Sequence, residues 1–521
     1  MKNITKIKLK NFKRFKSFEV DFDENLNIFI GDNESGKSSI LEAIDLVLCG
    51  SRSKVETAGL ENLFNSEVIH NFLASNKNYN DTPTLFIELY FNEQDNSDLN
   101  GKNNSEKVIC DGLKLEIIPD DDASKDIKDI LNQGEPVFPF EFYAIKFSTF
   151  ADSFYSGYKK YFKHILVDNS QISGEYAIKE YVKNMFNFFV QPIEKNIYQN
   201  EYRKHKESFR NNVLTSLNDK VPKYEFAIRN NSKSNLETDL ILMDDNISIE
   251  NKGKGVQSFI KTEFALNKTA SNIDIILLEE PENHLSHINM KKLIDSISSA
   301  TKRQIFISTH SNLICARLNL RNAIMLNSNR EVPASLNKID VDTASFFIKA
   351  SNNKILEFVL SKKIVLVEGN AEFILMEVFF EKITGTKLET SDIHIISVDG
   401  ICFKRYLEFA KVLKIKTAVV TDNDGKPQEN CINNYADYSK LDFIKIFVAT
   451  DDKLTTFEKC LYAINKDHCD TLFASKRKTL SVLDFMLKNK TEVAFQLLNE
   501  NTDSLNVPDY IKEAIEWIIK E

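Results

Sequence analysis

The chain has 521 residues, 42% of them hydrophobic and 27% charged, which is enough for two or three globular domains and excludes a disordered tail. Its net charge of -9 argues against a protein that binds nucleic acid over its whole surface, although a local basic patch is compatible with it. Seven scattered cysteines without a C-x-x-C pair argue against a disulfide framework or a zinc ribbon, and the apolar runs are shorter than the roughly 20 residues that cross a bilayer, so we expect a cytoplasmic protein that binds no membrane.

A glycine loop between a strand and a helix is the first motif in the chain. The apolar segment LNIFI predicts a strand, GDNESGKSS follows it, and SSILEAIDLVL has helical spacing. This context favours a phosphate-binding loop over an ordinary strand-to-helix turn, because backbone N–H groups, a lysine and a hydroxyl can then surround phosphate oxygens and Mg²⁺. The residues expected to bind ATP here are Gly31, Asn33, Gly36, Lys37, Ser38 and Ser39.

The middle of the chain alternates between helix and strand patterns. Residues 170–215 have apolar side chains at helical spacing and predict a helical insertion, and strands are expected near 224–230 and 237–245. The glycines near 253 introduce a helix, after which IDIILLEE and QIFISTH predict strands on either side of a helix at 290–300. Such alternation predicts a mostly parallel, doubly wound α/β sheet.

Acidic and basic side chains end two of these strands. IDIILLEE places Glu279 and Glu280 at the end of a buried strand, where one carboxylate can hold Mg²⁺ and the next can orient the attacking water. A buried acidic pair without a cation would repel itself, so the pair itself favours a metal. QIFISTH ends in His310, which is placed to contact a γ-phosphate, although a histidine at a strand end is more often structural.

A second series of strands begins near residue 355. The segments KKIVLVEGN, IHIISVDG, KTAVVTDND and FIKIFVAT are short and β-rich, with loops and helices between them, and the C-terminus PDYIKEAIEWIIKE is helical. These segments predict a separate α/β domain with a parallel sheet.

Four carboxylates follow two strands of this second series. Glu368 ends one strand, and Glu372 lies four residues on, in the first turn of a helix. Asp422 and Asp424 end a later strand, where alternate positions point to one face, so we expect the two side chains to converge. Because such a group is repulsive when empty, Mg²⁺ or Mn²⁺ is the expected ligand. Taken alone, the D-x-D pair would more often be a turn or a helix cap.

Together, the glycine loop and the Glu279–Glu280 pair resemble the ABC-type ATPase head of the SMC and RecF group and of the overcoming-lysogenisation-defect (OLD) nucleases. The E-G-x-x-E and D-x-D motifs resemble a TOPRIM metal domain. The chain order, head and then TOPRIM, resembles the OLD family over essentially its whole length. By that resemblance, residues 251–259 occupy the place of the ATPase signature loop, with Gly253, Gly255 and Gln257 expected to close over ATP. The family also implies Glu458 as a further metal ligand and Lys490, with Lys488 as rival, as a lysine that assists the reaction.

The resemblance implies an ATP-binding, metal-dependent DNA endonuclease that cuts by a two-metal mechanism. Glu280, Glu368, Asp422 and Lys490 are its expected catalytic residues. We expect an ATPase domain at 1–165 and 241–354, a dimerising helical insertion at 166–240 and a TOPRIM domain at 355–521. Defence of bacteria against phage, a homodimer or higher oligomer, and a companion protein or nucleic acid encoded nearby enter by resemblance alone. The alternatives are an ATP-switched DNA-repair clamp with a non-cutting TOPRIM domain and an ATPase that regulates a separate toxin.

Overall fold

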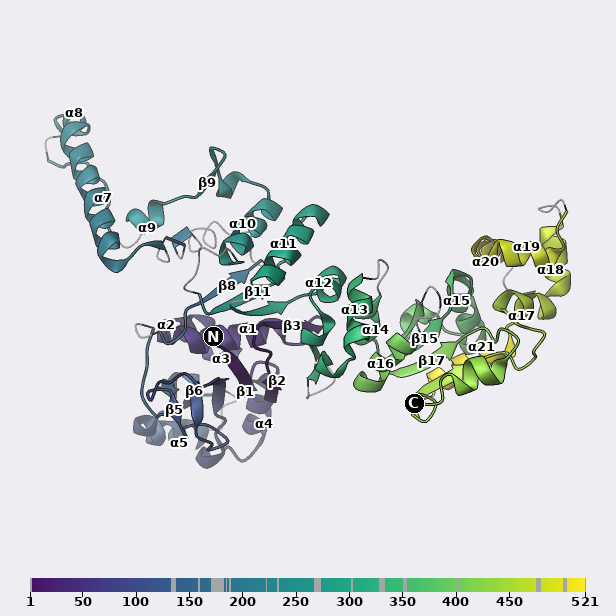
Figure 1. Ribbon diagram of the computed structural model, residues 1–521. Helices are drawn as coiled ribbons and strands as arrows, with labels where there is room; N and C mark the ends of the chain where they lie inside the picture. Colours follow the sequence, from purple (N-terminus) through teal and green to yellow (C-terminus); the bar gives the residue numbers. More distant parts are fainter. Residues whose placement is uncertain are drawn as a thin grey trace. The chain divides into compact units, whose positions relative to one another are not determined.

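The computed structural model describes most of the chain (Figure 1). The described residues are 2–132, 137–157, 160–169, 182–183, 185–186, 189–221, 223–231, 234–266, 273–300, 303–327, 333–349, 354–398, 400, 403–474, 479–499 and 504–520. Contacts divide them into two compact units, the first formed by Met1–Ile28 and Gly36–Thr309 and the second by Phe29–Ser35 and His310–Glu521. Among these residues, no helix is both long and apolar enough to span a membrane.

The first unit contains an antiparallel sheet that the sequence did not indicate. Its strand order is β2-β1-β4-β6-β5, with β7 also paired to β6. In β1 and β2, buried side chains are interspersed with more exposed ones, as expected when one face of an antiparallel sheet is covered, whereas β4 is buried almost throughout. The bounds are β1 (Ile4–Phe12), β2 (Phe15–Asp21), β4 (Leu85–Phe91), β5 (Asn100–Gly101), β6 (Cys110–Pro119) and β7 (Tyr143–Thr149), and the helices between them are α2 (Arg52–Ala58), α3 (Leu60–Leu63), α4 (Ser66–Ala74) and α5 (Ser124–Asn132).

The parallel strands predicted for the ATPase region are confirmed. Strand β11 (Ile275–Glu279) lies between β8 (His164–Asp168) and β12 (Gln304–Ser308), and all three run in the same direction. The predicted helices are also present as α1 (Lys37–Cys49), α10 (Lys254–Leu266) and α11 (His287–Ser299), and β3 (Leu26–Gly31) is the strand that leads into the glycine loop. The side chains of β11 from Ile275 to Leu278 are fully buried, which explains why these strands have continuous apolar runs.

The expected strands at 224–230 and 237–245 are wrong. Residues 224–230 have no regular structure where they are described, and Tyr224 and Phe226 are more than half exposed. Without a partner strand or a covered face, an alternating pattern does not form a sheet. The second segment forms α9 (Leu236–Asp239) and a two-residue hairpin of β9 (Met243–Asp244) and β10 (Ile247–Ser248).

Helices form in the described part of the segment with helical spacing, residues 170–215. They are α7 (Pro192–Asn212) and α8 (Thr215–Asn218). Helix α7 begins at the proline of this segment, with a capping box formed by Gln191 and Glu194. Most of the predicted segment before residue 189 lies outside the described residues.

The second unit contains the predicted parallel sheet, with strand order β16-β15-β17-β18. Figure 1 labels its two central strands, β15 and β17. Helices α15 and α21 contact its strands, and α16 contacts β17. The sheet consists of β15 (Lys363–Val367), β16 (Ile393–Ser397), β17 (Lys416–Val420) and β18 (Ile444–Phe447). The helices after residue 309 are α12 (Asn312–Arg317), α13 (Val341–Lys349), α14 (Ile355–Leu360), α15 (Asn370–Thr384), α16 (Phe403–Leu413), α17 (Phe457–Ile464), α18 (Lys466–Phe473), α19 (Val482–Lys488), α20 (Lys490–Asn499) and α21 (Asp509–Ile519), and the hairpin strands are β13 (Ala323–Leu326) and β14 (Ala334–Ser335).

Gln304 joins strand β12 to the first strand of the antiparallel sheet. Its fully buried side chain accepts a hydrogen bond from Ile4 N at 2.7 Å and donates to Ile4 O at 2.7 Å and to Asp23 O at 2.8 Å. One amide therefore satisfies three backbone groups in the core of the first unit.

We predict that Gln304→Ala destabilises the first unit by about 3 kcal/mol, because three backbone groups lose a partner. The midpoint of the first transition in urea unfolding measures the effect. Gln428→Ala changes an exposed glutamine and is the matched control. It should change the free energy of unfolding by no more than about 0.5 kcal/mol. Equal midpoints for the two variants would contradict the role given to Gln304.

Candidate functional sites at two sheet edges

The glycine loop leads into the N-terminus of α1. Gly36 precedes the helix with φ of +95°, and a Cβ there would lie 2.4 Å from the ring of Phe15. At Gly31, a Cβ would lie 2.2 Å from the Leu326 carbonyl oxygen, so both positions require glycine. Lys37 is buried while Ser38 is exposed, and the N–H groups at the start of a helix can donate hydrogen bonds to an anion. Of the other two expected residues, Asn33 is exposed and Ser39 half-buried.

Glu279 lies beside the start of α1. The Ser38 hydroxyl donates a hydrogen bond to its carboxylate. Burial raises the pKa of Glu279, the Ser38 hydrogen bond opposes this shift, and the nearby carboxylates of Asp168 and Glu280 raise the pKa further. A hydroxyl and a carboxylate in contact at a strand end are the pair that can share a Mg²⁺ ion beside a nucleotide phosphate.

Glu280 is held in an uncommon backbone conformation. Its φ is +43°, its backbone N–H donates to Ser308 O at 2.9 Å, and its Oε2 accepts a hydrogen bond from Asn283 Nδ2 at 2.5 Å. A left-handed, non-glycine residue at a strand end is typical of a site that fixes one side chain. His310 follows β12 by two residues and is exposed.

The structure adds Asp168 and Lys261 to this edge. Asp168 ends β8 and pairs in register with Glu279, while the buried Lys261 of α10 interacts electrostatically with Asp168. Burial lowers the pKa of Lys261, and Asp168 opposes that shift. The sequence carried a signal for Asp168, since HILVD, like IILLE, is an apolar run that ends in an acid.

The three residues of the predicted signature loop have different environments. Gly255 packs tightly, because a Cβ there would lie 2.1 Å from the His284 carbonyl oxygen, whereas Gly253 has open space around it. Gln257 is buried and donates from Nε2 to Lys252 O at 2.7 Å and to Glu250 O at 3.3 Å. The Gln257 amide therefore fixes the start of α10 within its own chain, and Gly253 is the member open to a ligand.

The second unit gathers its acidic residues where β15 and β17 end. Glu368 follows β15, and its Oε2 accepts hydrogen bonds from Asp422 N at 3.3 Å and Thr421 Oγ1 at 3.4 Å. Glu372 is buried in the first turn of α15, as predicted. The Asp422 carboxylate accepts a hydrogen bond from Phe457 N at 2.7 Å, at the N-terminus of α17.

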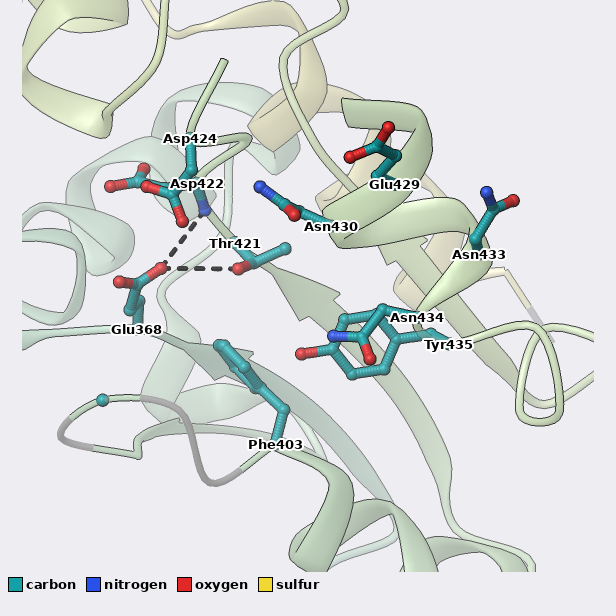
Figure 2. Close-up of a pocket in the computed structure, with 11 residues that line it drawn as sticks. Glu368, Phe403, Thr421, Asp422, Asp424, Glu429, Asn430, Asn433, Asn434 and Tyr435 are labelled. Carbon is teal, nitrogen blue, oxygen red and sulfur yellow. Dashed lines mark hydrogen bonds between the residues drawn. The ribbon is translucent and has the colours of Figure 1, made fainter. Parts of the chain in front are cut away.

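The expected strand alternation at Asp422 and Asp424 is wrong. Strand β17 ends at Val420, and Asp424 lies in a turn with φ of +49°. Asn423 fixes this turn: its buried side chain donates to Ala449 O at 2.8 Å and Asp451 O at 3.0 Å and accepts from Gly425 N at 2.8 Å. Both aspartates nevertheless line one cleft, because the turn presents them there (Figure 2).

Glu458 and Lys490 complete the acidic cluster. Glu458, in the first turn of α17, is 2% exposed, and its carboxylate lies 3.2 Å from Lys490 Nζ. Glu458 also acts electrostatically on both Glu372 and Asp422. Of the two lysines considered from the sequence, Lys490 is therefore the one in contact with the carboxylates, whereas Lys488 is exposed at the end of α19.

Two carboxylates of this cluster, Asp422 and Glu372, resist ionisation. Burial, followed by the charges of Glu368, Glu372 and Glu458, raises the pKa of Asp422 to about 8. Burial and its acidic neighbours likewise raise the pKa of Glu372 to about 7. The side chains of this cluster that could bind a metal are carboxylates, which fit hard divalent cations such as Mg²⁺ and Mn²⁺ better than soft metals. A cation would stabilise the charged forms that the chain alone disfavours.

A cleft of about 590 Å³ opens beside these carboxylates (Figure 2). Glu368, Asp422 and Asp424 line one part of it, and Phe403 and Tyr435 line another. A short π-helical segment, Gln428–Asn433, adds Asn430 and neighbouring polar side chains to its wall. No motif in the sequence marked this wall.

Two protein-family models match the chain. The model described as AAA ATPase domain matches residues 1–210 and 120–315, and the model described as overcoming lysogenization defect protein-like, TOPRIM domain matches residues 359–424. The ATPase match therefore spans more than half of the chain.

Similar curated proteins include Endonuclease GajA of Bacillus cereus (strain VD045), which is 29% identical over 168 residues, 32% of this chain and 29% of the relative. The DNA replication and repair protein RecF of Clostridium kluyveri is 50% identical over 38 residues, 7% of this chain and 10% of that protein. The chain thus spans less than a third of the length of either relative.

Similar solved structures include an SMC head bound to the C-terminal winged-helix domain of ScpA, with a TM-score of 0.36 and 17% identity over 64% of this chain and 99% of that one. The C-terminal region of the Xanthomonas campestris pv. campestris OLD protein has a TM-score of 0.24 and 19% identity over 30% of this chain and 92% of that one.

We predict that Asp422→Asn stabilises the metal-free protein. In the unfolded chain this carboxyl ionises near its ordinary pKa of 3.8, but in the fold only near 8. As pH rises between these values, the free energy of unfolding of the wild type falls on the order of 2 kcal/mol further than that of the neutral variant. Asparagine retains an oxygen that can accept the hydrogen bond from Phe457 N.

Thermal unfolding in a chelator at pH 5 and pH 8 measures this difference. The unfolding temperature of the variant, relative to that of the wild type, should be higher at pH 8 than at pH 5. Added Mg²⁺ or Mn²⁺ should stabilise the wild type more than the variant. Asp437→Asn, which changes an exposed acid, is the matched control. A variant that is less stable than the wild type at pH 8 without metal would refute the repulsion.

Proposed function

Because this chain belongs to the AAA ATPase domain family and carries a TOPRIM domain of the overcoming-lysogenisation-defect type at residues 359–424, we propose that it is an ATP-binding, divalent-metal-dependent DNA endonuclease. The observation that carries the proposal is the acidic cluster of the second unit, in which burial and mutual repulsion raise the pKa values of Asp422 and Glu372. The name of the similar Bacillus cereus protein, Endonuclease GajA, supports the same activity.

The acidic cluster would hold two cations. We assign Glu368, Glu372, Asp422, Asp424 and Glu458 as ligands, and Mg²⁺ or Mn²⁺ as the ions. When bound, such a pair supplies an activated water and positive charge against the leaving oxygen of a phosphodiester.

The remaining chemistry belongs to side chains of the chain itself. Lys490 lies 3.2 Å from Glu458 and is half-exposed at the cluster. Its ammonium group can stabilise the negative charge that develops on a phosphoryl oxygen. The hydrogen bond from Phe457 N fixes Asp422 at the start of α17, so that this carboxylate is oriented before substrate arrives.

The glycine loop and the start of α1 would bind ATP. Lys37 and the loop from Gly31 to Ser39 would hold the phosphates, and Ser38 with Glu279 would hold Mg²⁺. Glu280, fixed by Asn283, would orient the attacking water, and Gly253 of a second subunit would close over the nucleotide.

Assembly and biological role belong to the proposal as well. We propose a cytoplasmic homodimer or higher oligomer, formed through the ATPase domain (1–165 and 241–354) and the helical insertion (166–240), with the nuclease in residues 355–521. Defence against phage, together with a companion protein or nucleic acid, is the role we infer from the family. With a net charge of -9, DNA contacts should be confined to the groove near the metals.

The repair-clamp alternative receives less support. The likeness to RecF of Clostridium kluyveri covers 7% of this chain, whereas the OLD-like TOPRIM model covers the residues that carry Glu368, Glu372, Asp422 and Asp424. A non-cutting domain would also have no use for a cluster of carboxylates that repel one another.

We predict that Asp422→Ala reduces metal-dependent nicking of plasmid DNA at least 100-fold, because the metal site loses a central ligand. ATP binding should be unchanged, since Asp422 is not one of the residues assigned to the nucleotide. Gel analysis of supercoiled plasmid, with Mg²⁺ or Mn²⁺ and ATP varied, measures the cutting. Asp437→Ala is the control and should cut normally; equal cutting by both variants would rule out the assignment.

For the ATP site, we predict that Lys37→Ala abolishes ATP binding and hydrolysis, because the buried lysine that faces the phosphates is lost. Equilibrium binding of a fluorescent ATP analogue and phosphate release measure the two effects. Lys102→Ala changes an exposed lysine and should bind ATP normally. Full hydrolysis by the Lys37 variant would place the nucleotide elsewhere.

A further inference from the structure

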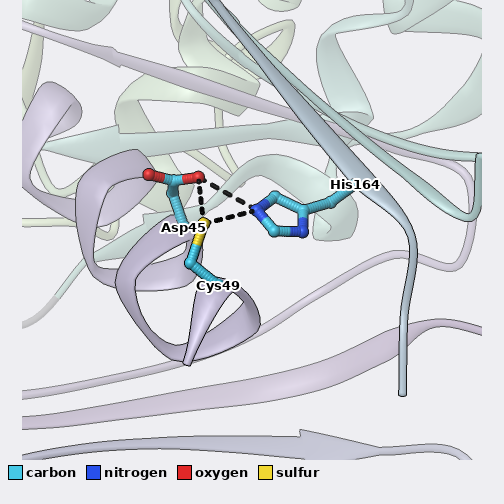
Figure 3. Close-up of side chains that lie close together, drawn as sticks. All are labelled: Asp45, Cys49 and His164. Carbon is cyan, nitrogen blue, oxygen red and sulfur yellow. Dashed lines mark hydrogen bonds and ion pairs between the residues drawn. The ribbon is translucent and has the colours of Figure 1, made fainter. Parts of the chain in front are cut away.

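A third group of metal-ligating side chains lies in the first unit, outside the two sites above (Figure 3). Asp45 and Cys49 are four residues apart near the end of α1, so their side chains share one face of the helix. His164 is the first residue of β8, and its ring points at both of them. Oxygen, sulfur and nitrogen donors thus meet from two elements that are distant in sequence.

The spacing of the three donor atoms suits a tetrahedral cation. His164 Nε2 lies 2.9 Å from Asp45 Oδ1 and 3.6 Å from Cys49 Sγ, and Cys49 Sγ lies 3.6 Å from Asp45 Oδ1. Around a tetrahedral zinc ion with bonds of about 2.0–2.3 Å, ligand atoms are about 3.3–3.6 Å apart. Both contacts of the sulfur fit that spacing, and the carboxylate and ring need to separate by only a few tenths of an ångström.

We propose that Asp45, Cys49 and His164 bind a transition-metal cation of the zinc class, with water as the fourth ligand. The mixed sulfur, nitrogen and oxygen set selects such a metal over Mg²⁺, which prefers oxygen alone. The acidic cluster of the second unit prefers Mg²⁺ or Mn²⁺. The two clusters would therefore bind different classes of metal ion.

Burial favours a structural ion here. Asp45 is 3% exposed and the His164 side chain 4%, while Cys49 is half-buried. Lys54 contacts Asp45 through the other carboxylate oxygen, Oδ2, so Oδ1 remains turned toward Cys49 and His164. Lys54 Nζ also lies 3.9 Å from Cys49 Sγ, a contact that a metal ion on the sulfur would replace, while the bond to Oδ2 would continue to orient the carboxylate.

A proton is the competing occupant of this position. Burial alone would lower the pKa of His164, but hydrogen bonds and charges from Asp45 and Cys49 raise it to about 9. Nδ1 has no hydrogen-bond partner among the described residues, and it carries a proton both in the charged ring and in the neutral ring that binds a metal through Nε2. Because an unpaired donor costs more on a charged ring than on a neutral one, this burial disfavours the proton more than the metal.

The position of the cluster suggests what the ion would do. Helix α1 starts at the phosphate loop, and β8 ends at Asp168 beside Glu279. An ion held by Asp45, Cys49 and His164 would tie these two elements together one helix length from the nucleotide site.

Cobalt substitution of the full-length chain tests the proposal. Co²⁺ bound to Cys49 should give a thiolate-to-cobalt charge-transfer band in the near ultraviolet. The intensity of the band should correspond to one cobalt ion per chain at this site. Cobalt in the oxygen-only cluster gives no such band. Cys49→Ser should abolish the band, and Cys110→Ser, which changes another half-buried cysteine, should leave it unchanged. Zinc measured after dialysis should fall by one equivalent in Cys49→Ser alone.

X-ray absorption at the zinc edge of the wild-type protein gives an independent result that needs no variant. One sulfur neighbour at about 2.3 Å, with nitrogen and oxygen neighbours, is expected. Absence of the band in the wild type, a band that persists in Cys49→Ser, or zinc with oxygen and nitrogen neighbours only would each overturn the proposal and leave an Asp45–His164 ion pair.

Discussion

The repulsion between carboxylates at the ends of parallel strands is the constraint on which both candidate sites depend. Parallel pairing in register brings strand ends to one edge: Glu279 pairs with Asp168, and Val367 pairs with Val420 just before Glu368 and Thr421. Charges placed side by side and partly buried raise each other's pKa. Hydrogen bonds from Ser38 in one unit and from Phe457 N in the other oppose this repulsion. A cation at each edge, as the proposed function requires, would relieve this repulsion.

The parallel strands and their acidic ends could be predicted from sequence because each signal is local. A continuous apolar run that ends in an acid describes both β11 with Glu279 and β15 with Glu368, and nothing distant is needed to recognise it. The antiparallel sheet was missed for the opposite reason. Its strands β1, β4 and β6 are far apart in sequence, and only their pairing shows that they form one sheet.

The candidate sites show the same limit in finer detail. Asp168, like Glu279, ends an apolar run, but its partner strand is more than a hundred residues away. Its place beside Glu279 is therefore known only once the register of the two strands is known. The convergence of Asp422 and Asp424 was expected from strand alternation and instead comes from a turn that Asn423 fixes by bonding to Ala449 O and Asp451 O. Contacts of that kind join segments whose proximity no local pattern encodes.

Strand β8 offers a physical route between the buried Asp45–Cys49–His164 cluster and the nucleotide edge. It is five residues long, with His164 at its start and Asp168 at its end, and it pairs with β11 along its whole length, from His164 with Ile275 to Asp168 with Glu279. A short strand paired at every residue moves as a rigid element, because a local shift would break several hydrogen bonds at once. An ion that draws His164 toward α1 would therefore act on the spacing between Asp168 and Glu279, and so on the pair of carboxylates that any Mg²⁺ at the phosphates must meet.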